Sequence, residues 1–241
     1  MSVRIAMWSG PRNISTAMMR SFGARADCAV SDEPFYGAFL KATGEPHPMA
    51  AETIADMDCD WRSIAAAQSG PIPGGKALWY QKHMPHHMVG PLSIRDLPEH
   101  RHAFLIRAPE RVVASYAAKK ELRTAEMLGF AKLREYFEFE ADRTGKAPPV
   151  LDTDIVLQDP ANVLSKLCGA LKIAWDSAML TWEKGPHLQD GVWGAHWYDA
   201  VNASTGFAPP PGLLPELEGE YLAVAEACRS DYEALRAFAI N

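Results

Sequence analysis

The sequence predicts an α/β protein of three layers, in which a central, mainly parallel sheet of about five strands lies between helices. Short apolar, β-branched or aromatic runs alternate with longer helical stretches, a pattern typical of a parallel sheet covered on both faces. The first run ends in a turn of glycine, proline and hydroxyl residues that leads directly into a helix. With 241 residues, 48% of them hydrophobic and 22% charged, the chain can bury the core that this fold requires.

Five runs are expected as strands, and the first and fourth are almost wholly apolar, as central parallel strands should be. They cover residues 3–8, 28–31, 77–81, 102–106 and 149–152. Helices are expected over residues 15–24, 109–119, 121–144, 160–171, 177–183 and 215–238. We see no internal repeat or domain boundary and expect residues 1–241 to form one domain. Two insertions, 36–75 and 184–212, interrupt the pattern, and we expect them to cover a ligand site.

Charge and cysteine content narrow the class of protein. A net charge of −6 argues against broad electrostatic capture of nucleic acid or of an anionic membrane. The four cysteines are widely spread and form no CxxC pair, which favours reduced thiols over a zinc site or a disulfide framework. The sequence shows neither a signal-peptide pattern nor an apolar run of membrane-spanning length. We therefore expect a cytoplasmic protein.

The turn after the first strand has the composition of a phosphate-binding loop. Gly10 and Pro11 shape the turn, while Ser15 and Thr16 can cap the helix and donate hydroxyls. The free N–H groups at the start of the helix, together with its dipole, favour a bound phosphate. Arg12 adds a forked, permanently charged donor. An ordinary capped turn with a solvent-facing arginine is the alternative, but arginine beside paired hydroxyls favours phosphate binding.

A second glycine-rich stretch, Gly70-Pro71-Ile72-Pro73-Gly74-Gly75-Lys76-Ala77, nearly matches the Walker A pattern. Its last residue lacks the hydroxyl that would bind magnesium, and its two prolines remove N–H groups from the loop. It also precedes a strand, whereas a Walker A loop follows a strand and opens a helix. We interpret this stretch as a chance match in a loop.

Two motifs together resemble those of the P-loop sulfotransferases. The run Pro11-Arg12-Asn13-Ile14-Ser15-Thr16 resembles the family's 5′-phosphosulfate loop, whose common form is Pro-Lys/Arg-Ser-Gly-Thr/Ser-Thr/Ser. Arg107, at the end of the fourth expected strand, and Ser115, eight residues later in the next helix, resemble its 3′-phosphate motif. Residues 151–185 are similar to the family's later region. The resemblance therefore touches most of residues 1–185.

This resemblance implies a P-loop, sulfotransferase-like fold and the co-substrate 3′-phosphoadenosine 5′-phosphosulfate (PAPS), with no metal required. The acceptor would be a hydroxyl or amine of a small molecule, and Arg12 would lie at the reacting end of the donor. Ile14 stands where the family usually has glycine, which restricts the loop backbone. The implied donor-binding residues are Pro11, Arg12, Asn13, Ile14, Ser15, Thr16, Arg107 and Ser115.

Two residues are candidates for the base that takes the acceptor's proton. His83 follows Gln81-Lys82 in a run similar to the Lys-x-His-x-Pro stretch of cytosolic sulfotransferases, and an imidazole titrates near neutral pH. On that match Lys82 would point elsewhere, because neighbouring strand residues alternate faces. Glu33 follows the second strand in a Glu-Pro context similar to that of some bacterial sulfotransferases, and a dry pocket would raise its pKa. The choice between His83 and Glu33 stays open.

Other readings also remain open. His83, His86 and His87 resemble a metal cluster, but a metal site usually includes a carboxylate or cysteine at defined spacing, so we expect no metal. A P-loop kinase using ATP would leave Arg107 and Ser115 unexplained. A nucleotide-binding module without transfer activity is the non-enzyme alternative. The identity of the acceptor and the oligomeric state do not follow from the sequence.

Overall fold

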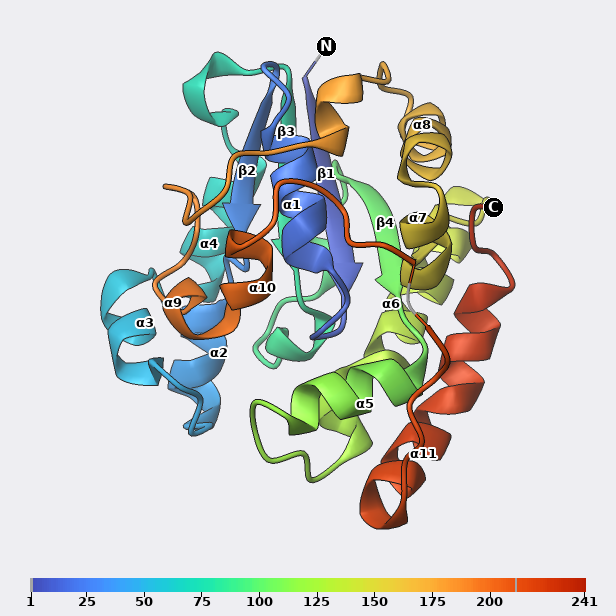
Figure 1. Ribbon diagram of the computed structural model, residues 1–241. Helices are drawn as coiled ribbons and strands as arrows, with labels where there is room; N and C mark the ends of the chain where they lie inside the picture. Colours follow the sequence, from blue (N-terminus) through green and yellow to red (C-terminus); the bar gives the residue numbers. More distant parts are fainter. Residues whose placement is uncertain (1, 211) are drawn as a thin grey trace.

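The computed structural model describes residues 2–210 and 212–241, and these form a five-stranded sheet with helices around it (Figure 1). The strands are β1 (Val3–Ser9), β2 (Cys28–Asp32), β3 (Leu78–His83), β4 (Arg101–Ile106) and β5 (Val150–Asp152). Their order is β2-β3-β1-β4-β5, and all four neighbouring pairs are parallel. The predicted α/β class and parallel sheet are confirmed.

The central strand β1 contributes to both faces of the sheet because its side chains alternate. Ile5 and Met7 belong to one buried cluster, whereas Ala6 and Trp8 belong to another. The first cluster includes residues of α1 (Ser15–Gly23) and α8 (Pro160–Ala170). The second includes residues of α2 (Tyr36–Thr43), α4 (Trp61–Ser69), α6 (Phe130–Thr144) and α11 (Gly219–Arg236). Helices thus cover the sheet on both sides, as the alternating pattern predicts.

The helix expected over residues 121–144 is divided at Gly129. This glycine has a φ of 71°, a conformation that residues with a side chain rarely adopt. A Cβ atom there would lie 3.3 Å from His86 Nδ1. A short 3₁₀ turn, Ala125–Leu128, precedes the break and α6 follows it. The prediction of one continuous helix is therefore wrong.

The other expected helices are present with adjusted bounds. Residues 177–183 hold a short 3₁₀ turn, Ser177–Leu180, and the last helix begins at Gly219 rather than at residue 215. The remaining helices are α3 (Ala50–Asp56), α5 (Pro109–Ala117), α7 (Thr153–Gln158), α9 (Gly194–Trp197) and α10 (Asp199–Asn202). No helix among the described residues is both long and apolar enough to cross a membrane.

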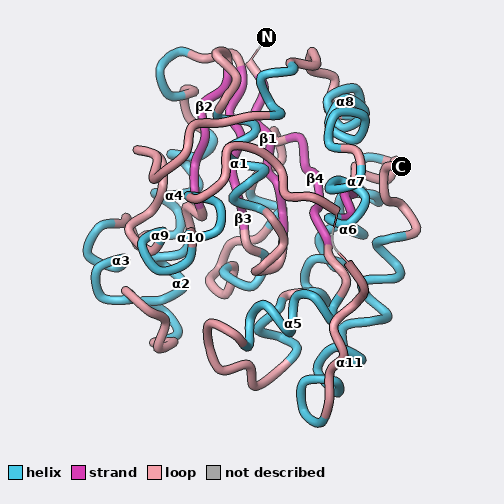
Figure 2. Tube along the Cα trace, viewed as in Figure 1, coloured by secondary structure: helices cyan, strands magenta, loops and turns pink. Residues whose placement is uncertain are grey.

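The two predicted insertions pack against one another. Residues 36–75 fold into α2, α3 and α4. Residues 184–210, which we call the covering segment, are mostly loop with the short helices α9 and α10 (Figure 2); Pro211, in the predicted insertion 184–212, lies outside the described residues. Side chains from α2 form a buried cluster with Trp193 and Tyr198 of the covering segment.

Candidate functional site

The loop between β1 and α1 has an unusual backbone. Arg12 and Ile14 both have positive φ values, 63° and 48°. Ile14 is the N-cap residue of α1, and no side-chain hydrogen bond caps the helix there. Asn13 Nδ2 donates to the carbonyl of Leu105 at 3.1 Å, which ties the loop to β4. Among the described residues, no side chain therefore caps the first N–H groups of α1, which lie at the end of the helix whose dipole favours an anion.

Gly10 allows the loop to pass very close to the neighbouring chain. A Cβ atom at this position would lie 2.5 Å from the carbonyl oxygen of Leu128, closer than real Cβ atoms approach. The loop is thus held between β4 on one side and the turn before α6 on the other. Its shape depends on glycine here for reasons of space.

Arg12, Arg107 and Ser115, which we call the arginine cradle, come together at this loop although they are far apart in the sequence. Arg12 Nε donates to Ser115 Oγ at 2.9 Å, and Arg107 Nη1 donates to the carbonyl oxygen of Arg12 at 2.8 Å. Ser115 lies in α5, directly after β4 and Arg107. The structure therefore brings the two predicted phosphate motifs into direct contact.

The arginine cradle holds two guanidinium groups that interact with carboxylates at longer range, Arg12 with Asp199 and Arg107 with Asp154. Neither Arg12 nor Arg107 forms an ion pair with a carboxylate in the described part of the chain. Arg107 Nε is also buried without a hydrogen-bond partner among the described residues. Burial lowers the pKa of both guanidinium groups. Two desolvated arginines and an unpaired buried donor fit a ligand that brings several anionic oxygens.

A cavity of about 390 Å³ joins the loop to the ends of β2 and β3. Aromatic residues of the covering segment form one wall, among them Trp193, Trp197 and Phe207. Every predicted donor-binding residue lines this cavity: Pro11, Arg12, Asn13, Ile14, Ser15, Thr16, Arg107 and Ser115. Glu33 lines it as well, and so does Lys82. His83 is absent from the lining.

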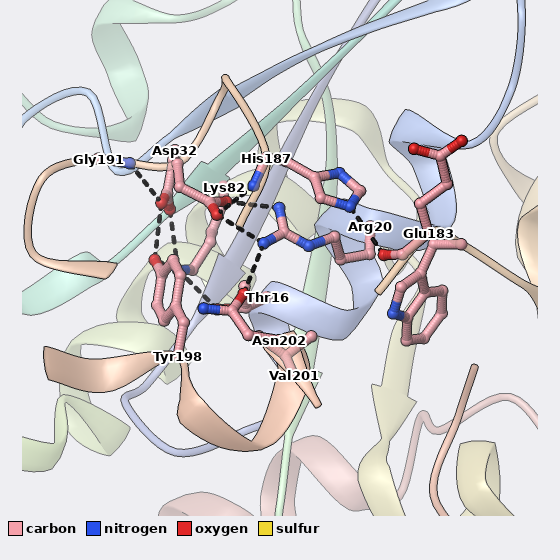
Figure 3. Close-up of polar contacts among 12 residues, drawn as sticks. Thr16, Arg20, Asp32, Lys82, Glu183, His187, Gly191, Tyr198, Val201 and Asn202 are labelled. Atoms are coloured by element: carbon pink, nitrogen blue, oxygen red, sulfur yellow. Dashed lines mark hydrogen bonds and ion pairs between the residues drawn. The ribbon is translucent and has the colours of Figure 1, made fainter. Parts of the chain in front are cut away.

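Lys82 lies at the centre of a buried polar network beside the cavity (Figure 3). Its ammonium, on a side chain that is 1% exposed, is 2.9 Å from Asp32 Oδ1 and 2.7 Å from Glu33 Oε1. It also donates to Tyr198 OH at 2.7 Å and to Thr16 Oγ1 at 3.1 Å. Burial alone would lower the pKa of Lys82, but the two carboxylates raise it well above its ordinary value. The lysine is therefore a cation next to the phosphate loop.

Glu33 follows β2 with a φ of 43°, a conformation that is costly for a residue with a side chain. Burial raises the pKa of its carboxyl group, Lys82 lowers it, and Asp32 raises it further, so that the pKa ends above its ordinary value. Glu33 Oε2 is 3.8 Å from His87 Nδ1. A carboxylate of raised pKa that lines a cavity has the character of a general base.

His83 lies on the opposite face of β3 from Lys82. Its ring stacks on Trp8 with 4.7 Å between ring centroids, and its Nε2 is 3.2 Å from Gln81 Oε1. Burial lowers the pKa of this imidazole well below its ordinary value. Strand alternation was rightly expected to separate Lys82 from His83, but the structure places the lysine, not the histidine, beside the cavity.

Sequence reasoning missed Lys82, Tyr198 and Asp32 as members of the site. Asp32 accepts hydrogen bonds from Tyr198 OH at 2.7 Å and from the Gly191 amide at 3.3 Å. One sequence signal could have pointed to Lys82: it is a charged residue near the end of β3, a strand that begins with the apolar and aromatic run Leu78–Tyr80. Among the described residues, no group of three or more His, Cys, Asp or Glu side chains could hold a metal ion.

Comparison with known proteins places the chain in a family. Residues 3–239 match the family model of the sulfotransferase domain. That match extends over the loop, the arginine cradle, the Lys82 network and the covering segment. The chain belongs to the sulfotransferase-domain family, as the two motifs led us to expect.

The chain is also similar to two plant proteins in sequence and to a solved sulfotransferase in fold. The chain is 34% identical over 235 residues to branched-chain-amino-acid aminotransferase-like protein 2 of Arabidopsis thaliana and 35% identical over 206 residues to protein 1 of the same name. The matched regions take up 96% and 86% of this chain but 41% and 37% of the two relatives, so the chain spans less than half of their length. The crystal structure of a sulfotransferase from Alicyclobacillus acidocaldarius aligns with the whole of this chain over 98% of its own length, with a TM-score of 0.59 and 10% sequence identity. This last match shows the fold.

Proposed function

We propose that the protein is a sulfotransferase that moves a sulfuryl group from PAPS to a hydroxyl or amine of a small molecule. The observation that carries the proposal is the contact between Arg12 of the loop and Ser115, with Arg107 beside them, at one end of a cavity that Glu33 also lines. PAPS has a phosphate at its 3′ position and a phosphosulfate at its 5′ position. A loop at a helix start and a second arginine site in contact with it suit such a donor.

The residues divide between holding the donor and promoting transfer. Arg107 and Ser115 would hold the 3′-phosphate, while Ser15, Thr16 and the amides at the start of α1 would hold the 5′ end. The acceptor oxygen or nitrogen would attack sulfur as the bond from sulfur to the bridging phosphate oxygen breaks, and adenosine 3′,5′-bisphosphate leaves. Arg12 and Lys82 supply positive charge where the leaving phosphate oxygen becomes more negative.

Glu33 is the base in this proposal because it lines the cavity and has a raised pKa. It would take the acceptor's proton as the new bond to sulfur forms. His83 is not assigned this role, since its ring is buried against Trp8 and does not line the cavity.

The names of the Arabidopsis relatives suggest an aminotransferase, and Lys82 is the lysine of this chain that lines the cavity. A lysine that forms a Schiff base must lose its proton to become nucleophilic. Lys82 instead lies between two carboxylates that raise its pKa. Its environment therefore favours a fixed cation over a Schiff-base amine.

The proposal is tested by binding of adenosine 3′,5′-bisphosphate to the purified protein. We expect this nucleotide to raise the melting temperature more than ATP at equal concentration, because it carries the 3′-phosphate that Arg107 would hold. Arg107→Ala should lose most of that shift. Arg95→Ala should keep it, because the Arg95 guanidinium lies over the Phe139 ring and outside the cavity lining. Absence of binding to the wild-type protein, or a larger shift with ATP, would contradict the proposal.

A further inference from the structure

We propose that Asp32 is a positioning residue, which competes with Glu33 for the Lys82 ammonium and so keeps Glu33 basic enough to accept the acceptor's proton. The inference rests on the proposed role of Glu33. It assigns a function to a carboxylate that does not line the cavity and that the proposed transfer step does not use. The two acids, Asp32 and Glu33, differ in how many hydrogen-bond donors hold them.

Asp32 is held by partners on both of its oxygens. Its Oδ1 is 2.9 Å from Lys82 Nζ, and its Oδ2 accepts from Tyr198 OH at 2.7 Å and from the Gly191 amide at 3.3 Å (Figure 3). Both Tyr198 and Gly191 belong to the covering segment. That segment is fixed further by Arg20, whose Nη2 donates to Asp190 Oδ2 at 2.6 Å and to Asn202 Oδ1 at 3.2 Å. The Asp32 carboxylate therefore has a defined position and charge-stabilising donors.

Glu33 is held much less firmly. Its Oε1 is 2.7 Å from Lys82 Nζ, while its Oε2 has His87 Nδ1 at 3.8 Å, beyond hydrogen-bond distance. Among the described residues, Lys82 is thus its one close charged partner. The freer oxygen belongs to the acid that lines the cavity, and the fully bonded carboxylate lies behind it.

A buried carboxylate paired one-to-one with a lysine would be a weak base, because the nearby cation favours its charged form. Lys82 does not form such a pair. An ammonium has three N–H donors, and here four oxygens lie within 3.1 Å of it, on Asp32, Glu33, Tyr198 and Thr16. Because Lys82 interacts with Asp32 as well, it stabilises the charge of Glu33 less. The negative charge of Asp32 also disfavours a negative charge on Glu33. Both effects make Glu33 hold a proton more strongly.

The other groups around Glu33 do not alter this balance. The titratable side chains that face it are Asp32, Lys82, His87, Tyr36 and Tyr198. Burial lowers the pKa of His87 well below its ordinary value, so this imidazole is neutral at pH 7 and adds no second cation. Burial also raises the pKa of Tyr36 and Tyr198, which stay protonated. Asp32 and Lys82 are left as the charged neighbours.

The test is a direct titration of Glu33, which needs no knowledge of the acceptor. Protein labelled with ¹³C at the glutamate carboxyl carbons is titrated by NMR, and Glu33→Gln identifies the Glu33 signal by its loss. In the wild-type protein we expect a midpoint above about 4.3, the value of a free glutamate. In Asp32→Asn we expect the midpoint to fall by about one pH unit or more, because Glu33 then has Lys82 to itself.

Asp152→Asn is the matched control, because Asp152 is also a buried carboxylate that accepts a tyrosine hydroxyl, here Tyr232 at 2.7 Å. It ends β5 and makes no contact with Lys82, so it should leave the Glu33 midpoint unchanged. A wild-type midpoint below about 4.3, or a midpoint unmoved or raised in Asp32→Asn, would overturn the inference. Should Asp32→Asn not fold, a wild-type midpoint below about 4.3 would still overturn the inference. Failure to bind adenosine 3′,5′-bisphosphate would instead count against the proposed function.

Discussion

The two edge strands of the sheet, β2 and β5, both end in a buried aspartate, but the two aspartates have different roles. β2 ends at Asp32 and β5 at Asp152, and both carboxylates are buried and accept a tyrosine hydroxyl at 2.7 Å. At the β5 edge, the Asp152 side chain also caps α7 by accepting from the Asp154 amide at 2.8 Å. Its tyrosine, Tyr232, belongs to α11, so Asp152 ties that helix to the sheet.

The cations make the difference between the two edges. Near Asp152 the cation is Arg236, at 3.8 Å and with a side chain that is 60% exposed. Near Asp32 it is the fully buried Lys82, which also contacts Glu33 and Thr16. A solvated cation contributes little energy and constrains little, whereas a buried one must be fully paired and holds its partners in place. The same aspartate–tyrosine pair is a structural tie at one edge and part of a charged site at the other.

Replacing each of the two cations, Lys82 and Arg236, should give the largest difference in unfolding free energy between the two edges. Lys82→Met is expected to reduce the free energy of unfolding by about 3–5 kcal/mol at pH 7, because Asp32 and Glu33 are left as unpaired buried charges. Arg236→Met should reduce it by about 1 kcal/mol or less. Urea denaturation of both variants measures the difference. The loss in Lys82→Met should shrink at pH 5, where Glu33 can take up a proton, and equal losses in the two variants would contradict this account.

Acid should act through two partly buried histidines that line the cavity, His47 and His86. Burial lowers the pKa of His47 to about 4 and that of His86 to about 3, whereas an unfolded histidine titrates near 6.5. The stability that these groups contribute is therefore full above about pH 6.5 and is lost as the pH falls through the folded values. Between pH 7 and pH 5 the free energy of unfolding should fall by about 2 kcal/mol for His86 and by less for His47, whose charge is better screened by solvent.

Urea denaturation at the two pH values measures this loss. His86→Gln should become less acid-sensitive than the wild-type protein, by about the share of one histidine. An unchanged slope in His86→Gln would show that its imidazole does not stay neutral in the folded protein.

Removing the hydroxyls of Tyr232 and Tyr198 should cause the smallest losses of unfolding free energy. The two variants test the same aspartate–tyrosine hydrogen bond at the two edges. Tyr232→Phe removes one hydrogen bond to a carboxylate and should lose about 1.5 kcal/mol. Tyr198→Phe should lose more, because its hydroxyl also accepts from Lys82 at 2.7 Å and from Trp193 Nε1 at 3.0 Å, and both donors would be left buried. The unfolding free energies of the two variants, measured side by side, test the order. The reverse order would mean that the Lys82 network adapts without Tyr198.

Much of the fold follows from local pattern. Apolar runs bounded by turns give the strands to within a few residues, and the loop after β1 leads into α1 as expected. The expected capping by the hydroxyls of Ser15 and Thr16 is wrong, because Ile14 is the N-cap residue and no side chain among the described residues caps the helix. The break at Gly129 in the helix expected over 121–144 was not predicted; this glycine has a φ of 71° and lies close against a tertiary neighbour, His86. A lone glycine in a helical pattern does not reveal that contact.

The site was predictable where one loop or one strand end carries it and less so where distant segments meet. The Arg107–Ser115 spacing pointed to a second phosphate position, but the bond between Arg12 and Ser115 is a tertiary fact. Alternation separates Lys82 from His83 without saying which of them faces the cavity; that depends on which helices cover each side of β3. Tyr198 reaches Lys82 from a covering segment whose path composition alone could not give.

Ile14 limits the number of shapes that the loop can adopt. Its φ of 48° costs a β-branched residue on the order of 1–3 kcal/mol, whereas glycine would adopt this angle freely and many others as well. A loop with few alternatives gives up less conformational entropy when it closes on an anion. If the loop binds an anion as we propose, the restricted backbone at Ile14 would favour binding, and Ile14→Gly should give a less strained but less ordered loop.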